Sequence, residues 1–70
     1  MSIDNMTNEK VASIIRETRR TSGITQQQLA DRVGVTKSYI SRIEGGSVEP
    51  SAGLFLRIID ALGLKIGKVI

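Results

Sequence analysis

The sequence contains no cysteine and no histidine, and each absence removes a class of protein. Without cysteine there is neither a disulfide framework nor a thiolate zinc site. Without histidine the commonest general base and the commonest metal ligand are both missing. We therefore select no catalytic or metal-binding residues and expect no cofactor. An enzyme would need a catalytic domain beyond Ile70.

Long apolar runs are also absent. No stretch approaches the ~18 consecutive apolar residues of a membrane span. The start of the chain, MSIDNMTNEK, has neither a cationic n-region nor an apolar h-region. These absences argue against a membrane partner and favour a cytoplasmic protein.

Length and charge narrow the choice further. Seventy residues form one domain at most, and such a domain buries only about 60% of its unfolded surface, so dimerisation would help to stabilise it. The net charge of +3 and the isoelectric point of about 9.8 favour an anionic partner. Basic residues outnumber acidic ones between residues 16 and 44, so the excess positive charge lies in the middle of the chain.

Residues 25–46, with the sequence TQQQLADRVGVTKSYISRIEGG, are predicted to form two short helices joined by a tight turn. Thr25 and Gln28 form a capping box at the start of the first helix, and Thr36 is the N-cap of the second. Gly34 lies where a left-handed residue would end the first helix, and the glycine pair at 45 and 46 can end the second. We expect the two helices to pack through an apolar seam of Leu29, Val33, Val35, Ile40 and Ile43.

The second helix of this pair has a polar and basic face. Its spacing of i, i+1, i+4 and i+5 places these side chains together, opposite Ile40 and Ile43. No carboxylate interrupts the face, cations can bind phosphate or guanine O6/N7, and a single helix fits the major groove of DNA. The alternative is a solvated helix face with incidental charge. The residues of the face are Lys37, Ser38, Ser41 and Arg42.

A helix is also expected before this pair, from about Asn8 to Thr21, preceded by a flexible lead-in at residues 1–7. Arg16 and Arg20 are interpreted as solvated charges on its outer side, and the alternative is a contact with DNA. Its inner stripe is predicted to contain Val11, Ile14, Ile15 and Thr18.

A fourth helix should begin after the N-cap Ser51 and run to about Leu62, with Gly63 following its end. Its apolar residues exceed one stripe. We assign the core stripe to Ala52, Phe55, Ile59 and Leu62, which leaves over Leu54, Leu56 and Ile58. The surplus suggests a subunit interface, and the alternative is that the C-terminal tail covers it.

The tail, residues 64–70, begins in alternation, with Leu64 and Ile66 on one side and Lys65 on the other. A short strand of this kind could pair with its copy in a second subunit to give a two-fold symmetric dimer. The alternatives are a frayed end or a linker. The predicted dimer interface consists of Leu54, Ile58, Leu64 and Ile66.

The chain from about Val11 to Gly63 resembles the helix-turn-helix family of the Cro and phage-repressor type, the XRE-like regulators. The most specific part of the resemblance is GITQQQLADRVGVTKSYISRIEGG. It implies a compact all-α, lambda-repressor-like domain of four helices, or five, over residues 8–63. In this family the second helix braces the phosphate backbone and the third, here Lys37 to Glu44, lies in the major groove.

The resemblance also implies roles for individual residues. Arg19 and Glu44 stand where the family often has a structural ion pair. The positions that read bases in the family hold Lys37, Ser38, Ser41 and Arg42. The positions that contact phosphates hold Thr25, Gln26, Tyr39, Gly46 and Ser47.

These features together predict a protein that binds double-stranded DNA as a homodimer and represses transcription at a roughly palindromic operator. Two alternatives remain open. The protein could be the antitoxin of a toxin and antitoxin pair, in which case it would also bind a toxin protein. It could instead be a protein-interaction module that has kept the fold without binding DNA.

Overall fold

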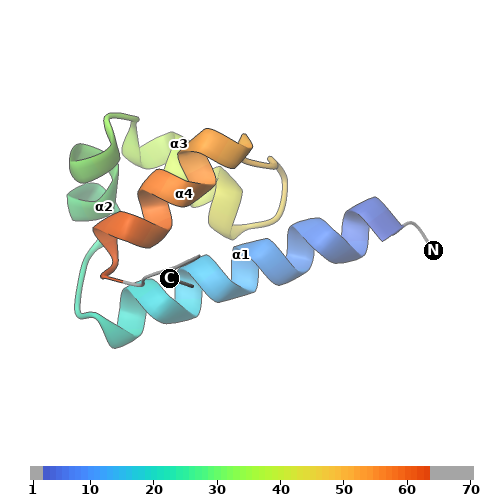
Figure 1. The fold of residues 1–70 in the computed structure, drawn as a ribbon, viewed down its shortest axis with the longest axis horizontal. Coiled ribbons are helices and arrows are strands. Elements are labelled where there is room, and N and C mark those ends of the chain that lie inside the picture. The colour runs from blue at the N-terminus through green and yellow to red at the C-terminus, as the bar shows by residue number, and fades with distance from the viewer. Residues whose placement is uncertain (1–2, 64–70) are drawn as a thin grey trace, which may run out of the picture.

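The computed structural model describes residues 3–63, and this part of the chain forms four α-helices without a strand (Figure 1). The helices are α1 (Ile3–Thr21), α2 (Gln26–Val33), α3 (Lys37–Glu44) and α4 (Ala52–Ala61). The expected all-α domain is therefore confirmed. None of these helices is long and apolar enough to cross a membrane. The predicted strand at residues 64–70 lies outside the described residues.

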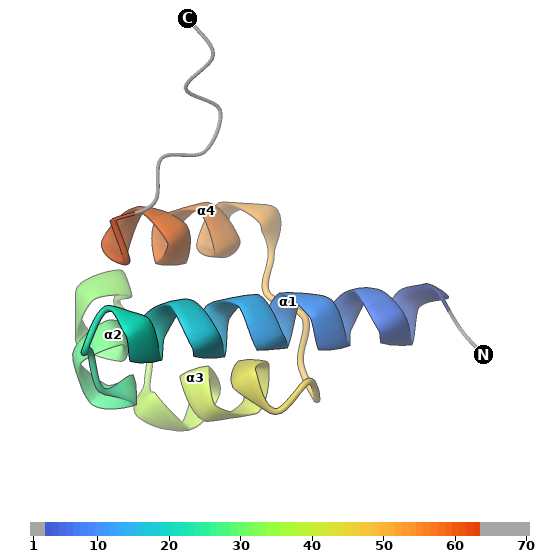
Figure 2. The same cartoon turned by 90° about the horizontal axis from the view of Figure 1, so that it is seen from below.

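Helix α1 begins earlier than predicted. It starts at Ile3 instead of Asn8, so residues 3–7 belong to the helix and the expected lead-in is wrong for them. Residues 3–22 contain neither glycine nor proline, and each residue added to an existing helix gains a backbone hydrogen bond. As a result, the N-terminal end of α1 extends beyond the other three helices (Figures 1 and 2).

Local signals set the ends of α2 as predicted. The capping box is complete: Gln28 N donates to Thr25 Oγ1 at 3.0 Å, and Thr25 N donates to Gln28 Oε1 at 2.9 Å. Gly34 ends the helix with a φ of 78°, in the left-handed region that favours glycine. Thr36 then caps α3, and its hydroxyl accepts Tyr39 N at 3.0 Å. The turn between α2 and α3 is therefore short and well determined.

The end of α3 has a left-handed glycine within the predicted pair, and the structure shows which one it is. Gly45 is right-handed, with a φ of −85°, and the left-handed residue is Gly46, with a φ of 81°. Only Gly46 therefore needs the conformational freedom of glycine. A side chain at position 45 would meet the carbonyl of Ser41 at an ordinary contact distance of 3.4 Å.

The core lies where α2, α3 and α4 meet α1. Ala30, a small residue on the inner face of α2, is fully buried. Helix α2 packs against both α3 and α4, and α1 packs against α3. The largest fully buried side chains are Ile15, Leu29, Ile40, Ile43 and Ile58.

Two predicted apolar stripes are only partly right: Ile59 and Leu62 of α4 and Ile15 of α1 are buried as predicted, but each stripe also contains an error. In α4, Leu54 and Ile58 are buried in the core of a single chain, with 6% and 0% of their surface exposed, whereas Ala52 is exposed. In α1, Ala12 is buried and Ile14 is 48% exposed. Because nearly every position of α4 is apolar, the pattern fits more than one stripe, and the packing against α2 selects one of them.

This correction changes the predicted dimer interface. Leu54 and Ile58 already pack inside the chain and are not free to contact a second subunit. The remaining two members, Leu64 and Ile66, lie outside the described residues. Leu56 is the large apolar residue of α4 that stays on the surface, at 53% exposed.

Candidate nucleic-acid interface

Helix α3 presents one polar face to solvent. Ile40 and Ile43 on the opposite side are buried at 0% and 1% exposure, which fixes how the helix is rotated. Among the described side chains, those of residues 8–63, no salt bridge occupies Lys37 or Arg42. The structure thus brings all four expected base-reading residues together on an exposed face: Lys37, Ser38, Ser41 and Arg42.

A buried ion pair anchors the end of this helix. Glu44, the last residue of α3, accepts hydrogen bonds from Arg19 Nε at 2.6 Å and from Arg19 Nη2 at 3.1 Å. The side chains of Glu44 and Arg19 are only 4% and 11% exposed. Because burial removes water from both charges, each charge is stabilised mainly by the other. The pair expected from the family resemblance is present.

Two further side chains take part in this cluster and were missed by the sequence interpretation. Gln26 Nε2 donates to Glu44 Oε1 at 3.0 Å, and Arg16 Nη1 donates to the main-chain carbonyl of Glu44 at 2.8 Å. The interpretation of Arg16 as a merely solvated charge is therefore wrong. Arg16 lies three residues before Arg19, on the same side of α1, and this spacing was the available signal. Gln26 of α2, which the family resemblance assigns to a phosphate contact, therefore also binds Glu44.

The expected phosphate-contacting residues differ in the donors that they still offer. The Thr25 hydroxyl accepts the N–H of Gln28, which leaves its own hydrogen available. Gln26 uses one of its two amide hydrogens on Glu44 and keeps the other. Tyr39 is half-buried against the core, and no described side chain or backbone group of residues 8–63 forms a hydrogen bond with its hydroxyl.

The hydrogen-bond donors of the loop after α3 are used within the protein. Gly46 N donates to Ile43 O at 3.0 Å, and Ser47 donates to Arg42 O from both its backbone nitrogen and its hydroxyl, each at 3.1 Å. In this conformation neither Gly46 nor Ser47 has a hydrogen left for a phosphate. Their bonds close the end of α3 instead.

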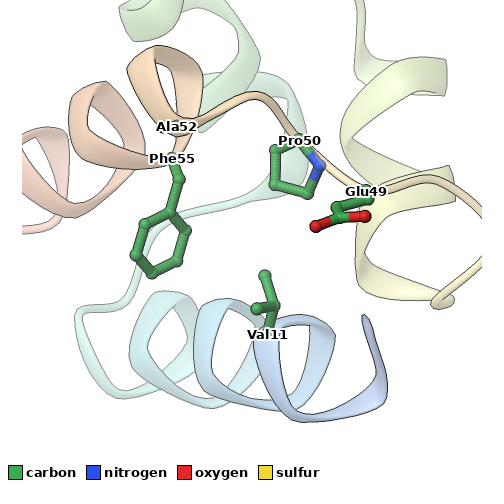
Figure 3. A pocket seen from close by; sticks show the side chains of 5 residues that line it. All are labelled: Val11, Glu49, Pro50, Ala52 and Phe55. Atoms are coloured by element: carbon green, nitrogen blue, oxygen red, sulfur yellow. The ribbon is translucent and has the colours of Figure 1, made fainter. Parts of the chain in front are cut away.

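A pocket of about 210 Å³ lies elsewhere, between α1 and the start of α4 (Figure 3). Figure 3 shows Val11 of α1 and Phe55 of α4 extending towards one another across it. Its lining is largely apolar and includes one carboxylate, so it does not suit an anion. None of the expected DNA-contacting residues lines it; the lining consists of Val11, Glu49, Pro50, Ala52 and Phe55.

Comparison with known sequences identifies the family. The helix-turn-helix family model HTH_3 matches residues 15–69. An HTH-type transcriptional regulator of Methanothermobacter thermautotrophicus, itself described as uncharacterized, is 49% identical over 51 residues, which make up 73% of this chain and 74% of the relative. Other matched regulators are longer, and the chain spans 30% to 36% of their length.

Solved structures show the same arrangement of helices. The restriction-modification controller protein C.AhdI of Aeromonas hydrophila superposes with a TM-score of 0.84 at 26% identity, over 91% of this chain and 93% of the other. The clp gene regulator ClgR of Corynebacterium glutamicum gives a TM-score of 0.81 at 31% identity, over 83% of this chain and 62% of the other. With its fold, its capped helix pair and these relatives in agreement, the chain belongs to the helix-turn-helix family of transcriptional regulators.

Proposed function

We propose that this protein binds double-stranded DNA as a homodimer, reads a roughly palindromic operator with α3 in the major groove, and represses transcription by blocking polymerase. The observation that carries the proposal is the exposed face of α3. It has two cations and two hydroxyls with no carboxylate, on a helix held at both ends. A helix of this kind fits the major groove of B-DNA.

Base recognition is assigned to the exposed face. Arg42 can form a bidentate bond with guanine O6 and N7, and Lys37 can bind the same acceptors as a point charge. Ser38 and Ser41 can donate to or accept from either kind of base pair. Arg42 is the strongest candidate because its guanidinium has two parallel donors and because it lies one helical turn beyond Ser38 on the exposed face.

Backbone recognition is assigned to residues around the start of α2. Thr25 and Gln26 each keep a free hydrogen there, and Tyr39 offers its hydroxyl from α3. These contacts would set the register of the protein on the duplex without reading its sequence. Gly46 and Ser47 are proposed only as loop residues that lie close to the DNA backbone. Their hydrogen-bond donors are already used at the end of α3.

The two-fold symmetry of a dimer explains why the operator should be palindromic. Two copies of α3 would enter successive major grooves about 10 bp apart. Leu64 and Ile66 remain the proposed contact residues between the subunits, whereas Leu54 and Ile58 are withdrawn because they belong to the core.

The test is selection of bound sequences from a randomised duplex pool, followed by fluorescence anisotropy on the enriched site across several salt concentrations. We expect a palindrome with half-sites about 10 bp apart and a slope of log K against log salt of several units. If no sequence is enriched and binding does not depend on salt, the DNA-binding proposal is wrong and a protein partner becomes the better hypothesis.

A further inference from the structure

The end of α3 is tied to another helix by its last main-chain carbonyl. A helix leaves four carbonyls unpaired at its C-terminal end. In α3 the first three of them accept backbone N–H groups of the following loop at 3.0 to 3.1 Å, from Gly45, Gly46 and Ser47. The fourth, Glu44 O, accepts Arg16 Nη1 of α1 at 2.8 Å. Arg16 therefore completes the hydrogen bonding of the helix end.

Two arginines one turn apart on α1 hold different parts of the same residue. Arg19 binds the carboxylate of Glu44, and Arg16 binds its carbonyl. The carboxylate contact by itself acts through the rotatable side chain of Glu44, so it leaves the backbone some freedom to turn. The carbonyl contact acts on the backbone directly, and it places a positive charge at the negative end of the helix.

We propose that Arg16 is a positioning residue, which sets the orientation of α3 and so contributes to discrimination between DNA sequences without touching a base. This inference rests on the proposed function. Arg42 lies two residues before Glu44, in the same last turn, so a displaced helix end also displaces the guanidinium that is proposed to read guanine. Bidentate base contacts tolerate little displacement, whereas phosphate contacts are less demanding.

A direct phosphate contact by Arg16 predicts a different result. Its side chain is 34% exposed, so its charge could also attract DNA of any sequence. Removing such a contact would weaken binding to cognate and random duplexes equally and would lower the salt slope by about one unit. Removing a positioning contact should weaken cognate binding selectively and leave the salt slope unchanged.

The experiment compares Arg16→Met with Arg20→Met in the full chain. Both variants remove one positive charge from α1 and keep an unbranched side chain. Arg20, however, is 61% exposed, and among the side chains of residues 8–63 its ion-pair partner is Glu17, at 3.9 Å. We expect Arg16→Met to bind the selected operator about tenfold more weakly than wild type, with random duplex within about twofold. Arg20→Met should stay within about twofold of wild type on both duplexes. All proteins are measured at a temperature at which circular dichroism shows them folded.

Amide hydrogen exchange provides a readout that needs no DNA. In Arg16→Met the amides of Gly46 and Ser47, which close the end of α3, should exchange about tenfold faster, while those of α2 and α4 keep their wild-type rates. Equal losses for Arg16→Met on both duplexes, matching losses for the two variants, or unchanged exchange at the end of α3 would each overturn the inference. If wild type selects no operator, the proposed function fails, and the exchange measurement still decides whether Arg16 holds the helix.

Discussion

At the scale of single residues, Glu44 links α3 to both α1 and α2 through its hydrogen bonds. Its carboxylate binds Arg19 and Gln26, and its carbonyl binds Arg16, so donors from α1 and α2 meet at the end of α3. Removing one partner of a buried ion pair leaves the other charge without compensation. The side chain of Glu44 therefore matters for stability, although it is buried and is not itself a proposed DNA contact.

We expect Glu44→Ala to lower the free energy of unfolding by about 3 kcal/mol, because the Arg19 guanidinium would stay largely buried without its carboxylate. Chemical denaturation monitored by circular dichroism measures the change. Glu17→Ala is the control, since Glu17 is 64% exposed and its ion pairs are long, so its effect should stay within about 0.5 kcal/mol. Similar losses for both variants would contradict the special role of Glu44.

Arg42→Ala should cost about 1 to 3 kcal/mol of binding free energy on the selected operator and relax the preference at one base pair. Fluorescence anisotropy on the operator and on a random duplex measures the loss. Arg57→Ala removes the same charge from an exposed position of α4 and serves as the control. Equal weakening of both duplexes by Arg42→Ala would count against base reading.

At the scale of the helices, the ends could be predicted from local chemistry and the inner faces could not in every case. The capping box at Thr25 and the N-cap at Thr36 depend on neighbours three residues away, so the sequence contains all the information that is needed. The stripe of α4 depends on which side α2 occupies, and the sequence does not contain that information locally. The misplacement of Leu54 and Ile58 follows from this difference.

The core position of Ile58 can be tested against the surface position of Leu56. Ile58→Ala should destabilise the protein by about 2 to 5 kcal/mol, because it removes a fully buried side chain and leaves a cavity. Leu56→Ala, at a residue that is 53% exposed, should change stability by no more than about 0.5 kcal/mol. Thermal unfolding of both variants decides the phase of the helix, and a larger loss for Leu56→Ala would show that the observed phase is wrong.

The two glycines after α3 give a matched pair at the end of an element. Gly46→Ala should destabilise by about 1 to 2 kcal/mol, since a side chain is unfavourable at a φ of 81° even though no atom lies in its way. Gly45→Ala should be neutral or slightly stabilising, because its φ of −85° suits any residue and alanine reduces the entropy of the unfolded chain. Equal effects in denaturant titrations would contradict the assignment of the left-handed residue to Gly46.

At the scale of the whole molecule, the long helix α1 packs against α3 and holds it in place. It contributes Ile15 to the core and the two arginines that hold α3, so one helix provides both packing and orientation. The exposed face of α3 then depends on long-range contacts between residues 25 to 28 positions apart in sequence. The exposed face of α3 that is proposed to read DNA therefore forms only when the whole domain folds.

The proposed dimer can be tested by introducing negative charge into the tail. Introducing Leu64→Asp and Ile66→Asp together should give a monomer in sedimentation velocity and weaken binding to the full palindrome by about 100-fold or more, because the linked second half-site would be lost. Lys65→Asp changes the side opposite in the predicted alternation and should remain a dimer. If the double variant still sediments as a dimer, Leu64 and Ile66 do not form the interface.

The sequence by itself determined the helix pair at the centre of the protein, the polar face of α3 and the Arg19–Glu44 pair. The first two follow from local caps and helical periodicity, and the third from the family resemblance. Only the tertiary structure decided that α1 begins at Ile3, that Leu54 and Ile58 belong to the core, and that Arg16 and Gln26 join Arg19 at Glu44. Burial and hydrogen bonding of these residues depend on partners from other helices, and an amphipathic pattern shows that a helix has an inner face without showing what that face meets.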